Sequence, residues 1–224
     1  PTKEMQVDLQ VGLDIDSVIL DGKSLLFRRD GNAYFVSVPQ NQEIKAIKNI
    51  IVYYHGIPRP AIRPPWDGGV IWSKDKSGNP WISVACQGLG ASVWYPCKDH
   101  QSDEPDSASV TMIVPDTLVA VSNGRWRSTI KNGDGTTAYT WAVTNPINNY
   151  NIIPYIGKYA HWHEDFAGEK GKLDCDYWVL DYNLDKAKEQ FKQAAQMLKC
   201  FEHWFGPYPF YEDGYKLVEA PHLG

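Results

Sequence analysis

The most constraining feature of the sequence is a change in hydrophobic periodicity close to Tyr182. Before that point apolar residues often alternate with polar ones, which is typical of half-buried strands. After it, apolar residues recur every three or four positions from Leu184 to Phe205, in a stretch rich in strong helix formers. Asn183 is a suitable N-cap, and a Gly-Pro pair follows as a stop signal. The pattern predicts strands up to about residue 182 and then one helix of about six turns.

Short strand-like segments recur between turn signals through the first part of the chain. They begin with residues 5–11, which alternate with period two, and later ones follow at intervals of roughly 8–12 residues. The later segments span residues 25–27, 33–38, 110–114, 118–122, 125–130 and 136–143. Asn-Gly and Asp-Gly pairs supply the positive-φ positions that tight hairpins need. This rhythm predicts a mainly β fold, a sandwich or a barrel.

Two further expectations concern burial. Residues 47–54 form an apolar, β-branched run, which predicts a strand buried on both faces. The chain also has nine Trp and thirteen Tyr, and aromatic side chains favour the half-buried surfaces of strands. We expect most of them to lie in the core, and the examples on which this rests are Tyr53, Tyr54, Trp126, Tyr139 and Trp141.

The change of period also predicts a domain boundary. We expect a β-rich domain over residues 1–182 and the beginning of a second domain over residues 183–224. After the helix, residues 215–219 have the pattern of one more strand. One helix and one strand cannot bury a core of their own, so we expect this second domain to be truncated.

Charge and hydropathy exclude two classes of partner. The formal net charge is −5 and the 22 Lys and Arg residues are scattered, which argues against nucleic acid. No apolar run reaches the roughly 18 residues of a membrane span. No signal-peptide pattern precedes the first strand. We expect that a chain starting at Pro1 has been trimmed at its N-terminus, so the missing signal does not decide the localisation. The cysteines Cys86, Cys97, Cys175 and Cys200 form no CxxC pair, and both disulfides and buried thiols are compatible with them.

The residues that could carry chemistry form no complete catalytic pattern. His161 and His163 would share one face of a strand, as some zinc ligands do, but no third ligand follows at a recognisable spacing. The segment beginning at His163 fails the HExxH test because its fifth residue is Ala167. We therefore expect no metal site and no catalytic residue in this chain. The acidic cluster around Asp99 and His100 predicts a surface turn in which side-chain oxygens accept backbone N–H bonds.

Residues 85–99 contain Gln87 nine positions before Pro96. This segment and two others resemble the aminopeptidase N family of zinc metallopeptidases, which places a Gln or Glu before a Pro-Cys-x-Asp string. Residues 145–159 are similar to the strand that precedes the family's domain junction, and residues 201–210 are similar to its first catalytic-domain helix and Gly-x-Tyr-Pro turn. Leu223 and Gly224 would be the first two positions of the family's GxMEN motif.

The resemblance implies that the chain is the N-terminal, non-catalytic portion of a zinc aminopeptidase. Its β-rich part would be the family's saddle-like N-terminal domain without its first strands, and its helix and last strand would begin the catalytic domain. Zinc would be held by the HExxH motif of the full-length enzyme, and none is expected in this chain. Its partners would be peptides with a free N-terminus and its own catalytic domain. Gln87, Leu223 and Gly224 would contribute to substrate binding.

The aromatic content leaves an alternative open, a secreted carbohydrate- or protein-binding β-sandwich. Sugar-binding modules display Trp and Tyr as exposed platforms. The expected burial of most aromatic residues and the C-terminal helix argue against such a module. The reading frame beyond Gly224 separates the two possibilities, because a peptidase requires Met-Glu there and HExxH some tens of residues later.

Overall fold

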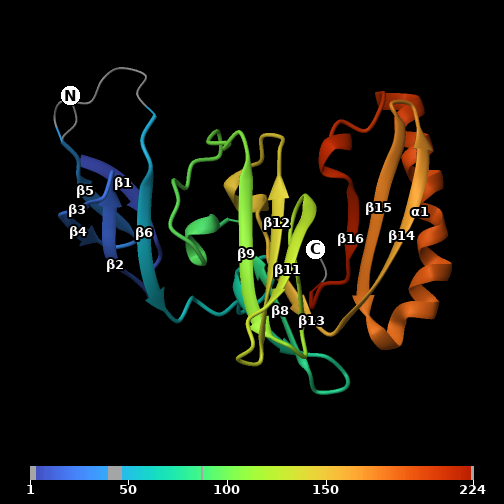
Figure 1. The fold of residues 1–224 in the computed structure, drawn as a ribbon, viewed down its shortest axis with the longest axis horizontal. Helices are drawn as coiled ribbons and strands as arrows, with labels where there is room; N and C mark the ends of the chain where they lie inside the picture. The colour runs from blue at the N-terminus through green and yellow to red at the C-terminus, as the bar shows by residue number, and fades with distance from the viewer. Residues whose placement is uncertain (1–3, 40–46, 87, 223–224) are drawn as a thin grey trace.

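In the computed structural model the structure describes residues 4–39, 47–86 and 88–222. These residues form five small sheets, arranged along an elongated molecule that ends in one long helix (Figure 1). Short 3-10 turns connect several of the strands: η1 (Ala91–Val93), η2 (Asn149–Asn151), η3 (Asp181–Asn183) and η4 (Tyr211–Asp213). The expected mainly β fold, with one long helix and a final strand, is confirmed.

Two three-stranded sheets make up the N-terminal end of the molecule. Their strand orders are β1-β5-β4 and β3-β2-β6. The strands are β1 (Glu4–Asp8), β2 (Leu13–Leu20), β3 (Lys23–Leu25), β4 (Phe27–Asp30), β5 (Ala33–Ser37) and β6 (Ile50–Gly56). Alternating side chains of these sheets meet in one core, in which Leu9, Val18 and Val36 are fully buried. The alternation of apolar and polar residues therefore places one face of each sheet inward.

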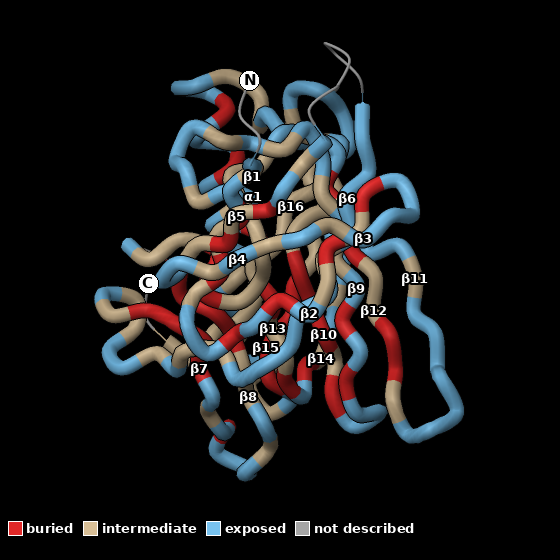
Figure 2. Tube along the Cα trace, turned by 90° about the vertical axis from the view of Figure 1, so that its left-hand side faces the viewer, coloured by how far each residue is buried: buried red, intermediate tan, exposed pale blue. Residues whose placement is uncertain are grey.

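Strand β6 contradicts the expectation of a strand buried on both faces. It is an edge strand that pairs with β2, and most of its residues are exposed, including Ile50, Ile51, Tyr53 and Tyr54 (Figure 2). An apolar run looks the same in the sequence whether the strand is central or at a sheet edge. The prediction that this strand is buried was therefore wrong. The predicted run begins at Ile47, which is itself 95% exposed.

Two further sheets form the middle of the molecule. Their strand orders are β10-β13-β8-β7 and β11-β12-β9. The strands are β7 (Gly69–Lys74), β8 (Pro80–Ala85), β9 (Ala108–Pro115), β10 (Val119–Val121), β11 (Arg125–Lys131), β12 (Thr136–Val143) and β13 (Tyr155–Gly157). Trp141 is buried at their centre, and its indole N–H donates to the carbonyl oxygen of Ala120 at 2.9 Å. Trp126 was expected in the core, but it is 47% exposed on β11.

The last sheet takes strands from both sides of the predicted domain boundary. Its order is β14-β15-β16, with β14 (Tyr159–Gly168), β15 (Gly171–Leu180) and β16 (Tyr215–Val218). β16 runs parallel to β15 and antiparallel pairing joins β14 to β15. The boundary at residue 182 stays a prediction, but the helix and final strand do not stand alone: the β14–β15 hairpin supplies their core.

Helix α1 (Leu184–Phe205) has the predicted bounds. Its residues Ala194, Leu198 and Glu202 follow at intervals of four and are buried against the β14–β15 hairpin. Gly206 ends the helix with a positive φ of 86°, a conformation that favours glycine. Asn183 does not cap through its side chain as predicted; its amide donates instead to Glu219 at 2.7 Å. No helix among the described residues has the length and hydropathy that a membrane crossing requires.

Candidate functional site

A pocket of about 680 Å³ forms where three distant segments of the chain converge. Cys86 and Gly88 contribute from the turn after β8, Asn149 and Tyr150 from η2, and His222 from the end of the described chain. The first two segments belong to stretches in which the sequence resembles the aminopeptidase N family, and His222 directly precedes Leu223 and Gly224, the predicted start of the GxMEN motif. The fold therefore gathers into one cavity wall residues that lie far apart in the sequence.

The turn after β8 is held in place by the carboxylate of Asp99. Its Oδ1 accepts a hydrogen bond from the backbone N–H of Ala91 at 2.8 Å, and the N–H of Ser92 lies within 3.3 Å of both carboxylate oxygens. The thiol of Cys97 also donates to it. Gly90 has a positive φ of 87°, and a Cβ there would lie 2.3 Å from this carboxylate, so the close approach requires glycine. Asp99 thus has the predicted role of a backbone acceptor.

The side chains that line this pocket are mostly neutral near pH 7. Burial, reinforced by the charge of Asp99, raises the pKa of the Cys86 thiol to about 12. Burial also raises the pKa of the Tyr155 hydroxyl and lowers that of the His222 imidazole. Nδ1 of His222 is buried and has no hydrogen-bond partner among the described residues. The four cysteines are free thiols. A thiol kept protonated is a poor nucleophile, so the raised pKa of Cys86 disfavours a nucleophilic role for this thiol.

The predicted substrate-binding residues Gln87, Leu223 and Gly224 lie outside the described residues. Their chain neighbours do not: Cys86, Gly88 and His222 all line the pocket. Sequence reasoning missed Tyr150 and Tyr155 as pocket residues, although both lie within the matched segment of residues 145–159.

A second cavity, of about 760 Å³, shares Asn151, Ile153 and Tyr155 with the first. Lys216 of β16 lines it, and its ammonium group donates to the carbonyl oxygens of Ser122 at 2.7 Å and Gly124 at 2.6 Å. The same group lies 3.8 Å from the centre of the Trp141 ring. Burial lowers the pKa of Lys216 to about 7. This contact ties the last strand to the middle sheets.

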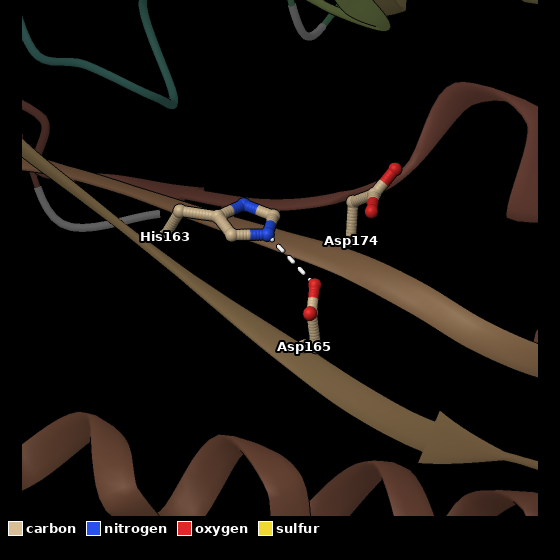
Figure 3. Close-up of side chains that lie close together, drawn as sticks. All are labelled: His163, Asp165 and Asp174. Carbon is tan, nitrogen blue, oxygen red and sulfur yellow. Dashed lines mark hydrogen bonds and ion pairs between the residues drawn. The ribbon is translucent and has the colours of Figure 1, made fainter.

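The histidines considered as metal ligands lie on the face of the β14–β15 hairpin opposite α1. His163, Asp165 and Asp174 bring one ligand atom each within 4.8 Å of one another (Figure 3). Asp165 is on the same strand as His163, and Asp174 lies opposite Asp165 on the paired strand. His161 is not part of this trio, because it bonds to Asp176 at 2.8 Å.

Each member of the trio already has a protein partner. His163 bonds through Nε2 to Asp165 at 2.8 Å and through Nδ1 to Asp176 at 3.2 Å. Asp165 also pairs with Lys172, and Asp174 pairs with Arg125. The hydrogen bond to Asp165, reinforced by Asp176, raises the pKa of His163, although burial opposes this. A metal ion needs deprotonated ligands, and it would have to displace Lys172 from Asp165 and Arg125 from Asp174. The geometry therefore favours an ion-pair network over a metal site.

Comparison with known proteins places the fold. No protein-family model and no curated protein matches the sequence. Among solved structures, an M1 zinc metallopeptidase from Deinococcus radiodurans matches the whole chain with a TM-score of 0.84 at 19% identity. A variant of that enzyme bound to a Tyr-Ser-Ala substrate matches equally well. Legionella pneumophila aminopeptidase A matches 94% of the chain with a TM-score of 0.70 at 13% identity.

The chain therefore has the fold found in part of the M1 zinc metallopeptidases. It spans 50% of the Deinococcus chain and 24% of the Legionella chain. The fold agrees with the resemblance noted in the sequence, because one neighbour is a zinc metallopeptidase and the other is an aminopeptidase.

Proposed function

We propose that the chain is the N-terminal, non-catalytic portion of a zinc-dependent aminopeptidase, and that it forms one side of a pocket for the substrate's free amine. The observation that carries the proposal is a pocket of about 680 Å³ that is lined by two of the family-like segments, residues 85–99 and 145–159, and by His222 next to Leu223. The likeness of the whole chain to half of an M1 zinc metallopeptidase supports it. The bound Tyr-Ser-Ala substrate of the Deinococcus variant supports a peptide as the substrate class.

The zinc ion of such an enzyme does not fit the residues of this chain. The sequence contains no HExxH motif, and the His163, Asp165 and Asp174 group is engaged in ion pairs. We assign the metal and the chemical step to the remainder of the parent enzyme, and to this chain the positioning of the substrate amine. An ammonium ion needs hydrogen-bond acceptors, and the side-chain oxygen of Gln87, whose neighbours line the pocket, is the proposed acceptor.

The test uses the full-length enzyme with peptides that carry a free or an acetylated N-terminus. One hydrogen bond to a charged group contributes about 1.5–3 kcal/mol. Gln87→Ala should therefore lower kcat/KM on free peptides by roughly 10- to 150-fold, and Gln87→Glu should retain activity because a carboxylate keeps the acceptor and adds attraction. Gln196→Ala, an exposed glutamine of α1, is the control.

Acetylated peptides should be poor substrates for the wild-type enzyme, and Gln87→Ala should affect them little. Equal losses on both classes of peptide would mean that Gln87 has a structural role in its turn. A reading frame that lacks Met-Glu after Gly224 and a later HExxH would refute the proposal as a whole.

The alternative of a carbohydrate-binding module draws on exposed tryptophans. Trp66, Trp72 and Trp204 are 69%, 59% and 72% exposed. They lie on different elements, a loop, β7 and α1, whereas a sugar platform needs aromatic rings on one surface. Binding of an oligosaccharide that is lost on Trp72→Ala would favour this alternative.

A further inference from the structure

One flank of helix α1 carries an apolar stripe, which we define as Met197, Phe201, Trp204 and Phe205. The four side chains are 39%, 52%, 72% and 83% exposed. Their spacing of four and then three or four residues places them along the last two turns of the helix. The buried face of the helix, with Ala194 and Leu198, lies beside the stripe and packs on the β14–β15 hairpin. The stripe is therefore a second apolar surface of the same helix.

The size of the stripe is unusual for an exposed surface. A Phe or Trp side chain buries 150–250 Å² when covered, so the three aromatic rings together expose roughly 300–500 Å². This equals the largest apolar patch of an ordinary monomer, which is often functional. The rings contact each other: those of Phe201 and Phe205 are 6.0 Å apart between centroids. Phe210, 43% exposed, follows shortly after the helix and extends the apolar character of this end.

We infer that the apolar stripe is the docking surface for the C-terminal half of the parent enzyme. The inference rests on the proposed function and names the surface through which that partner attaches. The length of the similar proteins supports this occupant: this chain covers 50% of the Deinococcus metallopeptidase, so about as much polypeptide again has no counterpart here. Burying the three rings replaces water-exposed aromatic surface with packing contacts and holds α1 against the second half.

The stripe is also free of charged side chains. The first turns of α1 present Lys186, Gln190 and Gln193 along the same flank, and the apolar character begins at Met197. A solvent-facing helix would continue the polar flank to its end, whereas a docking helix changes character where the partner begins. The occupant should therefore be an apolar surface that contacts the last two turns and leaves the earlier turns of the helix in water.

The experiment compares the same substitutions in two proteins, the 224-residue chain and the full-length enzyme. Trp204→Lys and Phe205→Lys introduce a charge into the stripe, and Trp72→Lys on β7 is the control because its ring is similarly exposed at 59%. In the 224-residue chain all three should shift Tm by less than roughly 2 °C, since they alter exposed positions. In the full-length enzyme the two stripe variants should lower Tm by more than roughly 5 °C, and Trp72→Lys should not.

Two results would overturn the inference. The first is an unchanged Tm for both stripe variants in the full-length enzyme. The second is a full-length enzyme that dimerises, as measured by light scattering, and loses its dimer on Trp204→Lys, because the occupant would then be a second copy. Aminopeptidase activity of the wild-type full-length enzyme is measured in parallel. If the wild-type full-length enzyme is active and the stripe variants keep its Tm, the docking surface alone is refuted. If the wild-type full-length enzyme folds but has no aminopeptidase activity, the proposed function is refuted.

Discussion

Glu202 offers the sharpest test of how the C-terminal part of the fold is held together. Its side chain is 5% exposed on α1 and its carboxylate accepts three hydrogen bonds. The donors are the Tyr211 hydroxyl at 2.7 Å, the backbone N–H of Glu169 at 2.9 Å and that of Tyr208 at 3.2 Å. These donors come from the β14–β15 turn and from the segment after the helix. One carboxylate therefore joins three parts of the chain.

Replacing Glu202 with Gln keeps the shape and removes the charge. Hydrogen bonds to a charged group contribute about 1.5–3 kcal/mol each, and the amide of Gln would face at least one of the three donors. The expected loss is about 2–4 kcal/mol, which for a chain of this size lowers Tm by roughly 5–15 °C. Glu189→Gln on the same helix is the matched control. Its side chain is 76% exposed and pairs with Lys192, so it should cost less than about 0.5 kcal/mol.

The pH dependence distinguishes a charge effect from a packing effect. Burial works to raise the pKa of Glu202, but the hydrogen bonds from Tyr211, Glu169 and Tyr208 lower it overall. A carboxyl with a lowered folded pKa stabilises the protein above its unfolded pKa of about 4.3 and loses this effect as pH falls through the folded value. Urea unfolding should show the Gln variant destabilised at pH 7 and progressively less below pH 4 or so. A loss that persists unchanged in acid, or one no larger than that of Glu189→Gln, would refute the reasoning.

Two further predictions concern the polar face of the β14–β15 hairpin. The hydrogen bonds with Asp165 and Asp176 raise the folded pKa of His163, so its stabilising effect is complete below its unfolded pKa of about 6.5 and declines as pH rises through the folded value. His163→Asn should therefore lower the free energy of unfolding more at pH 6 than at pH 9. A loss that is the same at both pH values would contradict this. The chain alone should neither bind zinc tightly nor release amino acids from peptides, since its His and Asp groups are already paired. Calorimetry that shows stoichiometric sub-micromolar zinc binding, abolished by substitution of His161 and His163, would contradict this prediction.

The features that sequence predicted well are those set by local interactions. Helix α1 begins at Leu184 and ends at Phe205 as its periodicity and its glycine stop indicated. The hairpin of β11 and β12 follows from alternating residues around turn residues. In both cases the deciding contacts join residues close in sequence, so the pattern contains the needed information.

The features that sequence missed depend on partners far along the chain. The amide of Asn183 bonds to Glu219, which arrives after the whole helix, and this bond replaces the predicted cap. Strand β6 lies at a sheet edge because no further strand pairs beyond it among the described residues, a fact that its own apolar run does not encode. The carboxylate of Asp174 approaches His163 through the register of two strands. The pocket lined by Cys86, Asn149 and His222 likewise exists only once the sheets have assembled.

The parallel pairing of β15 with β16 has a consequence for synthesis on the ribosome. All of η3, α1 and η4 must be translated between these two strands. At roughly 5–20 residues per second, the outer edge of β15 waits for a time on the order of seconds before its partner emerges. During that interval the strand presents unpaired N–H and C=O groups, which are a template for pairing with another chain. A nascent chain stalled before Tyr215 therefore exposes a strand edge that the finished fold covers, and we expect it to aggregate more readily than the chain in which β16 is paired.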